Sequence, residues 1–153
     1  MKELLEYRKK LGERLAEVAH EFCSACEKIK PATIVEGHWT LHQVAAHVRD
    51  IDRAVYGTRV RRTLMEENPL FESMDPDDWM AANYNKDEPL KKILGEFQQN
   101  IDELDRTLNE LPNEAWSRTS QHEKMGEGLT LQLWVERSLA HIEEHLNVLK
   151  KFF

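Results

Sequence analysis

The sequence lacks the features that mark several classes of protein. Six glycines and five prolines in 153 residues are too few for a collagen-like or low-complexity chain. No stretch approaches the roughly 18 consecutive apolar residues of a membrane span, and the charged N-terminus lacks the apolar segment of a signal peptide. Only two cysteines occur, Cys23 and Cys26, and no βαβ pattern surrounds them as a redox pair would require. We therefore expect buried structural thiols in a cytoplasmic protein that does not associate with membranes.

An excess of positive charge is also missing. The 21 Lys and Arg residues are outnumbered by 28 Asp and Glu residues, which gives a net charge of −7. This balance argues against nucleic acid or anionic lipid as a partner, because both require clustered cations. One local basic run, Arg59, Arg61 and Arg62, is followed by Glu66 and Glu67. We interpret it as the solvated end of a helix rather than as an anion site.

What the sequence does contain is helical periodicity. Hydrophobic residues make up 41% and charged residues 32%, a composition typical of a folded helical protein. Apolar residues recur at helical spacing in four segments, whereas no segment shows the alternation of a strand. The four segments are 4–29, 40–66, 90–111 and a last one from about residue 130 to 149. They predict one all-α domain over residues 1–153, a four-helix bundle with long connecting loops at 30–39, 68–88 and 112–129.

Two local signals mark helix starts. Thr40 and Gln43 fit a capping box, in which a threonine hydroxyl and a glutamine three residues later satisfy free backbone N–H groups. Asp75 followed by Pro76 predicts a short helical turn inside the 68–88 connection. Because connections of this length are often functional, we expect residues 68–88 to lie near any active site.

Three of the seven histidines fall on predicted inward faces. His141 and His145 are four residues apart on the last helix, so that both rings can reach one metal ion. His47 lies between Val44 and Ile51 on the apolar stripe of the second helix. Two imidazoles from one helix and one from another would leave a fourth coordination position open, the pattern of a catalytic site. An imidazole-only ligand set suits Zn, Ni or Cu better than Mg or Ca.

The alternative is that these are ordinary core histidines with hydrogen-bond partners. Three buried imidazoles without partners would each cost about 1–3 kcal/mol, a cost that metal binding would remove. Asp50, one turn after His47, could orient an imidazole by accepting its second N–H, or could simply be a solvated carboxylate. The other histidines are not expected to be ligands, although His122 could overhang the site from its loop.

At these residues the sequence resembles the DinB-like superfamily, in particular the bacterial branch that includes the bacillithiol transferases. The resemblance covers nearly the whole chain in order. It is carried by Trp39-Thr40, the segment VAAHVRD at 44–50, His122-Glu123 with Gly126, Leu129-Thr130 and the segment AHIEEHL at 140–146. The family often has a glutamate where this chain has Gln43.

The resemblance implies an up-down-down-up four-helix bundle that forms a homodimer in many members. It implies a divalent metal, often nickel or zinc, held by three histidines that map to His47, His141 and His145. Characterised relatives act on low-molecular-weight thiols such as bacillithiol or mycothiol. The leading hypothesis is therefore a metal-dependent enzyme that transfers such a thiol cosubstrate to a small-molecule electrophile. A hydrolase with water as the nucleophile, and a non-catalytic metal-binding or dimerising bundle, remain the alternatives.

Overall fold

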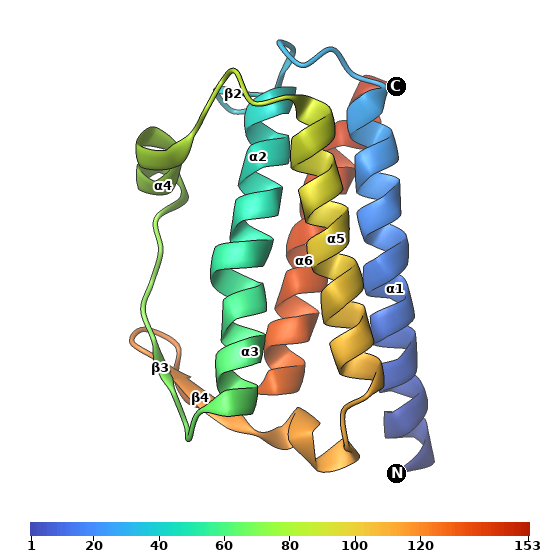
Figure 1. Ribbon diagram of the computed structural model, residues 1–153, viewed down its shortest axis with the longest axis vertical. Helices are drawn as coiled ribbons and strands as arrows, with labels where there is room; N and C mark the ends of the chain where they lie inside the picture. Colours follow the sequence, from blue (N-terminus) through green and yellow to red (C-terminus); the bar gives the residue numbers. More distant parts are fainter.

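Four long helical rods form the body of the molecule. The computed structural model describes residues 1–153. In Figure 1, α1 and α6 run upward, whereas the rod made of α2 and α3 and the rod made by α5 run downward. The rods are α1 (Lys2–Glu27), α2 (Leu41–Ile51) continued by α3 (Gly57–Met65), α5 (Leu90–Asn109) and α6 (Leu131–Leu149). The protein is thus a mostly helical four-helix bundle with an up-down-down-up order of helices.

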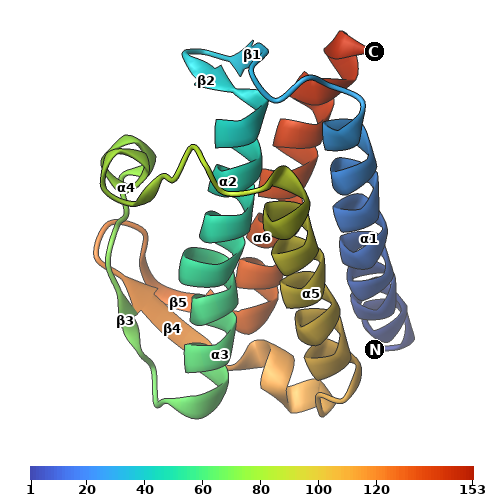
Figure 2. The ribbon, with the colours of Figure 1, turned by 45° about the horizontal axis from the view of Figure 1, so that its top comes forward.

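The predicted helix starts are present in detail. Gln43 N–H donates to Thr40 Oγ1 at 3.2 Å, and Gln43 Oε1 accepts the Thr40 N–H at 2.9 Å, which confirms the capping box. Asp75 caps α4 (Pro76–Asn83), which has Pro76 in its first turn. The predicted single turn is therefore a two-turn helix outside the bundle, visible beside α2 in Figure 2.

The connections contain short strands, so the expectation of no strands was wrong. Strands of two to five residues are too short to show an alternating pattern in the sequence. One sheet pairs β1 (Ile34–Glu36) with β2 (Trp39–Thr40), and the other orders β3 (Leu70–Phe71), β4 (Thr119–His122) and β5 (Gly126–Thr130). Both sheets lie at the edge of the bundle in Figure 2, and they position connecting segments against the helices. Short helical turns at Asn113–Ser117 and Lys150–Phe152 complete the chain.

One core runs the length of the bundle. It combines large residues from all four rods, among them Phe22, Phe97 and Trp134, none of which is exposed. The Phe22 and Phe97 rings meet edge to face, with centroids 5.5 Å apart. Both cysteines are free thiols. None of the helices combines the length and the apolar character needed to cross a bilayer.

The rod formed by α2 and α3 is a single continuous helix with one wide turn. Over Asp52–Tyr56 the helix has π geometry, and the Gly57 N–H donates to the carbonyl of Asp52, five residues earlier. A Cβ atom on Gly57 would lie only 2.6 Å from that carbonyl oxygen. The wide turn therefore requires a glycine at this position, since any side chain would push the two backbone segments apart.

Candidate metal centre

Three predicted histidines converge where α2 faces α6. The Nε2 atoms of His47 and His145 each lie 3.1 Å from Nε2 of His141. The nitrogen atoms that the three rings offer all lie within 4.8 Å of one another. His47 and His145 are buried, and His141 is half-buried. As predicted from their spacing of four residues, His141 and His145 lie on one face of α6, and both rings point at the His47 ring of α2.

The rings of His47 and His141 are held in their neutral form. Burial, followed by the nearby His145, lowers the pKa of His47 to about 3, and burial lowers the pKa of His141 to about 2, with His145 and His47 adding to the effect. A neutral imidazole has one nitrogen with a free lone pair. Lone pairs of ring nitrogens that point at one place repel each other, and a cation between them would remove that repulsion.

A carboxylate that sequence analysis missed lies behind His145. Glu36 Oε2, from β1, is 3.0 Å from His145 Nδ1. The two groups are close but not aligned, so that Nδ1 is a buried atom without a proper hydrogen bond. A small rotation would let Nδ1–H donate to Glu36 and leave the lone pair on Nε2, the usual arrangement of a metal-binding histidine. The orphaned Nδ1 and the converging Nε2 atoms together fit a three-histidine metal centre.

Asp50, the predicted orienting residue, lies elsewhere. Its carboxylate accepts hydrogen bonds from Arg49 Nε at 3.0 Å, Arg53 at 3.3 Å and Trp79 Nε1 at 3.1 Å. None of these partners is an imidazole, so in this structure Asp50 ties α4 to α2 through Trp79. Its predicted role as an orienter of His47 has no contact to support it, whereas Glu36 makes such a contact with His145.

Two aromatic rings enclose the histidines. The Trp39 ring, just before α2, lies 4.7 Å from the His47 ring between centroids, and the Tyr56 ring lies 5.8 Å from that of His141. Tyr56 belongs to the π turn, which explains why sequence periodicity did not place it here. In an unbroken α-helix Tyr56 would point about 180° away from His47, and the extra residue absorbed by the π turn reduces this to about 80°.

The same turn brings in Arg59. Regular α-helical geometry would direct Arg59 about 120° away from His47, but the π turn reduces the difference to about 20°. Arg59 is 8% exposed and lies against the Trp134 ring, 4.7 Å from its centroid. The interpretation of the basic run as a solvated helix end is therefore wrong for Arg59. It holds for its neighbours: Arg61 is exposed, and the half-exposed Arg62 pairs with Glu66 at 2.7 Å.

A cleft of about 380 Å³ opens beside the histidines, and His47 and His141 line it. The 68–88 connection contributes Ser73, Met74 and Pro76 to its wall, and the β4–β5 hairpin contributes His122, Lys124 and Met125. The remaining lining residues come from the bundle: Ile51, Val55, Tyr56, Arg59 and Arg137. The expected overhang of His122 and the expected position of the 68–88 connection near the site both agree with this arrangement.

The other histidines lie apart from the site. His42 is buried, but its Nδ1 is 2.5 Å from Tyr84 Oη and its Nε2 is 2.6 Å from the Glu88 carbonyl oxygen. It is a core histidine with both nitrogens satisfied, and it is not one of the three converging rings. His20 and His38 are exposed.

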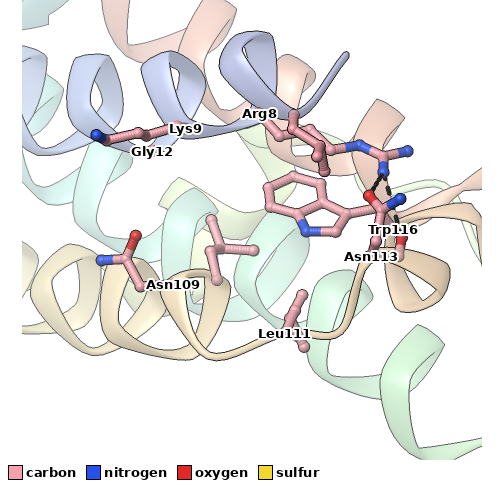
Figure 3. A pocket seen from close by; sticks show the side chains of 9 residues that line it. Arg8, Lys9, Gly12, Asn109, Leu111, Asn113 and Trp116 are labelled. Atoms are coloured by element: carbon pink, nitrogen blue, oxygen red, sulfur yellow. Dashed lines mark hydrogen bonds between the residues drawn. The ribbon is translucent and has the colours of Figure 1, made fainter. Parts of the chain in front are cut away.

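A second cleft of similar volume lies between the beginning of α1 and the end of α5. Figure 3 shows Arg8 extending over the Trp116 indole and bonding to Asn113. Gln132 Oε1 accepts a further bond from Arg8 Nε at 2.8 Å. This cleft contains no histidine, cysteine or carboxylate, so we assign the candidate site to the cleft at His47 and His141.

The comparisons with known proteins agree with this architecture. The solved structure of YfiT from Bacillus subtilis is similar in fold, with a TM-score of 0.85 over 95% of this chain and 85% of that one. The two sequences are 23% identical. YfiT is described as a probable metal-dependent hydrolase with an unusual four-helix bundle topology. The comparison with curated proteins gave no match.

The sequence also matches a family model over almost its whole length. The matched region covers residues 2–149, and so includes all four rods, both small sheets and the three converging histidines. The match agrees with the bundle and with the resemblance carried by the histidine segments. The chain belongs to the DinB superfamily.

Proposed function

We propose that this protein is a metal-dependent enzyme that activates a small thiol and transfers it to an electrophilic substrate. The observation that carries the proposal is the convergence of three imidazoles at one side of an open cleft. His47, His141 and His145 would hold the ion, for which Zn²⁺ or Ni²⁺ suits the nitrogen ligands best. A bound ion of this kind supplies Lewis acidity, which lowers the pKa of a thiol or water in its open position.

The surrounding residues have roles of their own in this proposal. Glu36 would accept the Nδ1–H of His145 after a small rotation of the ring, and so keep Nε2 directed at the other two rings. Trp39 packs against His47 and so excludes water from that side of the ligand set. Tyr56 lines the cleft beside His141, and its hydroxyl is free to donate to a substrate atom, because no hydrogen bond engages it in the structure.

Hydrolysis at the same centre is the second candidate. It is favoured by the fold shared with YfiT, a protein described as a probable metal-dependent hydrolase. The chemistry differs only in the nucleophile, a thiol in one case and water in the other. The three histidines serve both reactions equally, so the distinction rests on an assay rather than on geometry.

That assay compares turnover with and without a thiol. The metal-loaded protein is incubated with a small electrophile such as an aromatic halide, or with an ester, in the presence or absence of bacillithiol. We expect turnover of the electrophile that depends on thiol and disappears in His47→Ala. Ester turnover that needs no thiol and also disappears in His47→Ala would identify the hydrolase. No turnover in either assay by a metal-loaded protein would support a non-catalytic metal-binding bundle.

Replacing Glu36 by glutamine tests the support behind the metal centre. Because a neutral amide accepts the His145 N–H less strongly, Glu36→Gln is expected to weaken metal binding about tenfold or more. Affinity is measured by competition with a chromogenic chelator. Glu143→Gln is the matched control, since Glu143 lies on α6 between the ligands but contacts only Arg14, at 3.9 Å. Equal affinities in the two variants would contradict the role of Glu36.

The homodimer and the cytoplasmic location stay predictions. Sedimentation of the purified protein measures the first, and fractionation of cells measures the second. A small-molecule substrate is the partner that the cleft volume of about 380 Å³ suits.

A further inference from the structure

The cleft beside the histidines has a charge opposite to that of the protein as a whole. Acidic residues outnumber basic ones by 28 to 21 in the chain, yet no Asp or Glu lines this cleft. Three cations do: Arg59, Lys124 and Arg137. Glu123 is next to Lys124 in sequence but does not line the cleft, and its carboxylate accepts the Ser73 backbone N–H at 2.9 Å.

Arg59 is a buried cation without a countercharge. Its only hydrogen bond runs from one terminal nitrogen to the carbonyl oxygen of Glu72, at 3.1 Å. A guanidinium has five N–H donors, so most of those on Arg59 lack a protein acceptor. The two side-chain nitrogens of Arg59 without a hydrogen bond, Nε and Nη1, are not sealed off from the solvent, and Arg59 lines the cleft. Burial lowers the pKa of Arg59, and the nearby Arg137 adds to the effect against an opposing influence of Tyr56.

Two other arginines are as buried as Arg59, and both have several acceptors within the protein. Arg8 donates to Gln132 Oε1 at 2.8 Å and to the Asn113 carbonyl at 3.2 Å. Arg49 is bound by three carboxylates: Asp50 at 3.0 Å, Glu88 at 2.6 Å and Glu96 at 3.0 Å. An isolated buried charge is costly unless it is paired. Arg59 has instead the Trp134 face on one side and the open cleft on the other. Its countercharge is therefore expected to come from outside the chain.

His122 supplies a further donor to the same place. Its Nδ1 accepts the backbone N–H groups of Lys124 and Met125, at 3.1 and 3.2 Å. Because Nδ1 accepts, the hydrogen of the neutral ring resides on Nε2, which has no partner within the protein. The turn of the β4–β5 hairpin thus fixes His122 as an N–H donor on the wall of the cleft.

We propose that Arg59, Arg137 and His122 form a subsite for an oxyanion, a carboxylate or a phosphate, on the small molecule that binds at the histidine centre. The link between this subsite and the histidine centre rests on the proposed function, because it assumes that the bound molecule also reaches the reacting position. Lys124 at the mouth adds long-range attraction for an anion. The subsite selects acidic substrates or an acidic thiol against neutral ones of equal size.

The test measures anion binding apart from metal. Protein stripped with a chelator is titrated with succinate and, separately, with inorganic phosphate by calorimetry at low ionic strength. Arg59→Met keeps a long apolar side chain on Trp134 and removes the charge, so it is expected to weaken binding about tenfold or more. Arg137→Met is expected to weaken it severalfold. Arg61→Met, which removes one charge from the exposed side of the same helix, is the control and is expected to bind like the wild type.

Two results would overturn the proposal: no binding of either anion by the wild type, or equal binding by the Met variants at 59 and 61. Should Arg59→Met fail to fold, as judged by circular dichroism, the exposed Arg137 decides, and equal binding by the variants at 137 and 61 is again contradictory. Tighter binding of succinate would indicate a carboxylate as the natural ligand group, and tighter binding of phosphate would indicate a phosphate. If Arg59→Met loses anion binding but the wild type takes up no metal, the anion subsite stands and only the proposed function is overturned.

Discussion

Protein purified without an affinity tag is expected to contain about one Zn²⁺ or Ni²⁺ per chain, and His141→Ala is expected to lose it. His141 is the central ring of the cluster, with Nε2 atoms of two other histidines 3.1 Å away. Removal of an outer carboxylate costs 10- to 100-fold in metal affinity, so loss of a direct ligand is expected to cost at least about 100-fold. Elemental analysis measures the metal content, and His47→Ala is expected to behave in the same way.

The control is His20→Ala, because His20 is exposed on α1 and contacts none of the three rings. It should retain the full metal content. A wild type that is folded and metal-free under metal-replete conditions would refute the metal centre. The three histidines would then be core residues of an interaction bundle.

Trp134→Ala is expected to be the most destabilising single substitution near the site. Trp134 has no exposed surface, its ring meets Phe71 edge to face at 5.7 Å, and its Nε1–H donates to Ser120 Oγ at 2.7 Å. Truncation leaves a cavity and removes the hydrogen bond that Ser120 Oγ accepts, so we expect a loss of about 3–5 kcal/mol in the free energy of unfolding. Urea denaturation followed by circular dichroism measures it.

Trp134→Ala should also disturb the cleft beside the histidines, because the Arg59 guanidinium packs on the Trp134 ring. Trp134→Phe retains most of the packing and loses only the hydrogen bond, so a smaller loss of about 1 kcal/mol is expected. Trp79→Ala is a second control, since Trp79 is half-buried on α4 outside the bundle. A Trp134→Ala loss of less than about 1 kcal/mol would contradict the core described here.

Much of the fold was predictable because its signals are local. The apolar stripes, the capping box at Thr40 and the cap at Asp75 depend on residues a few positions apart, and each fixes a helix by itself. His141 and His145 were predictable for the same reason, since a spacing of four aligns them on α6. The position of His47 on an apolar stripe pointed it toward the same interior.

The residues that sequence analysis missed depend on features without a local signature. Glu36 reaches His145 from a three-residue strand, far from it in the sequence. Tyr56 and Arg59 reach the cleft only because the helix widens at Asp52–Tyr56, which a constant period of 3.6 residues cannot represent. The spacing of Asp50 left two interpretations open, an orienter of an imidazole or a solvated carboxylate, but its carboxylate is buried and accepts hydrogen bonds from Arg49, Arg53 and Trp79.

The wide turn between α2 and α3 also affects how this chain should be aligned with its relatives. It adds one residue between His47 and Arg59, so a relative whose helix is regular throughout would need a single-residue gap at 52–57. An alignment without that gap would pair Arg59 with a residue that faces another side of the rod. The glycine at 57 offers a marker for placing the gap, because its backbone contact with Asp52 leaves no room for a side chain. Relatives that share both the extra residue and the glycine are expected to present the same helix face to the cleft.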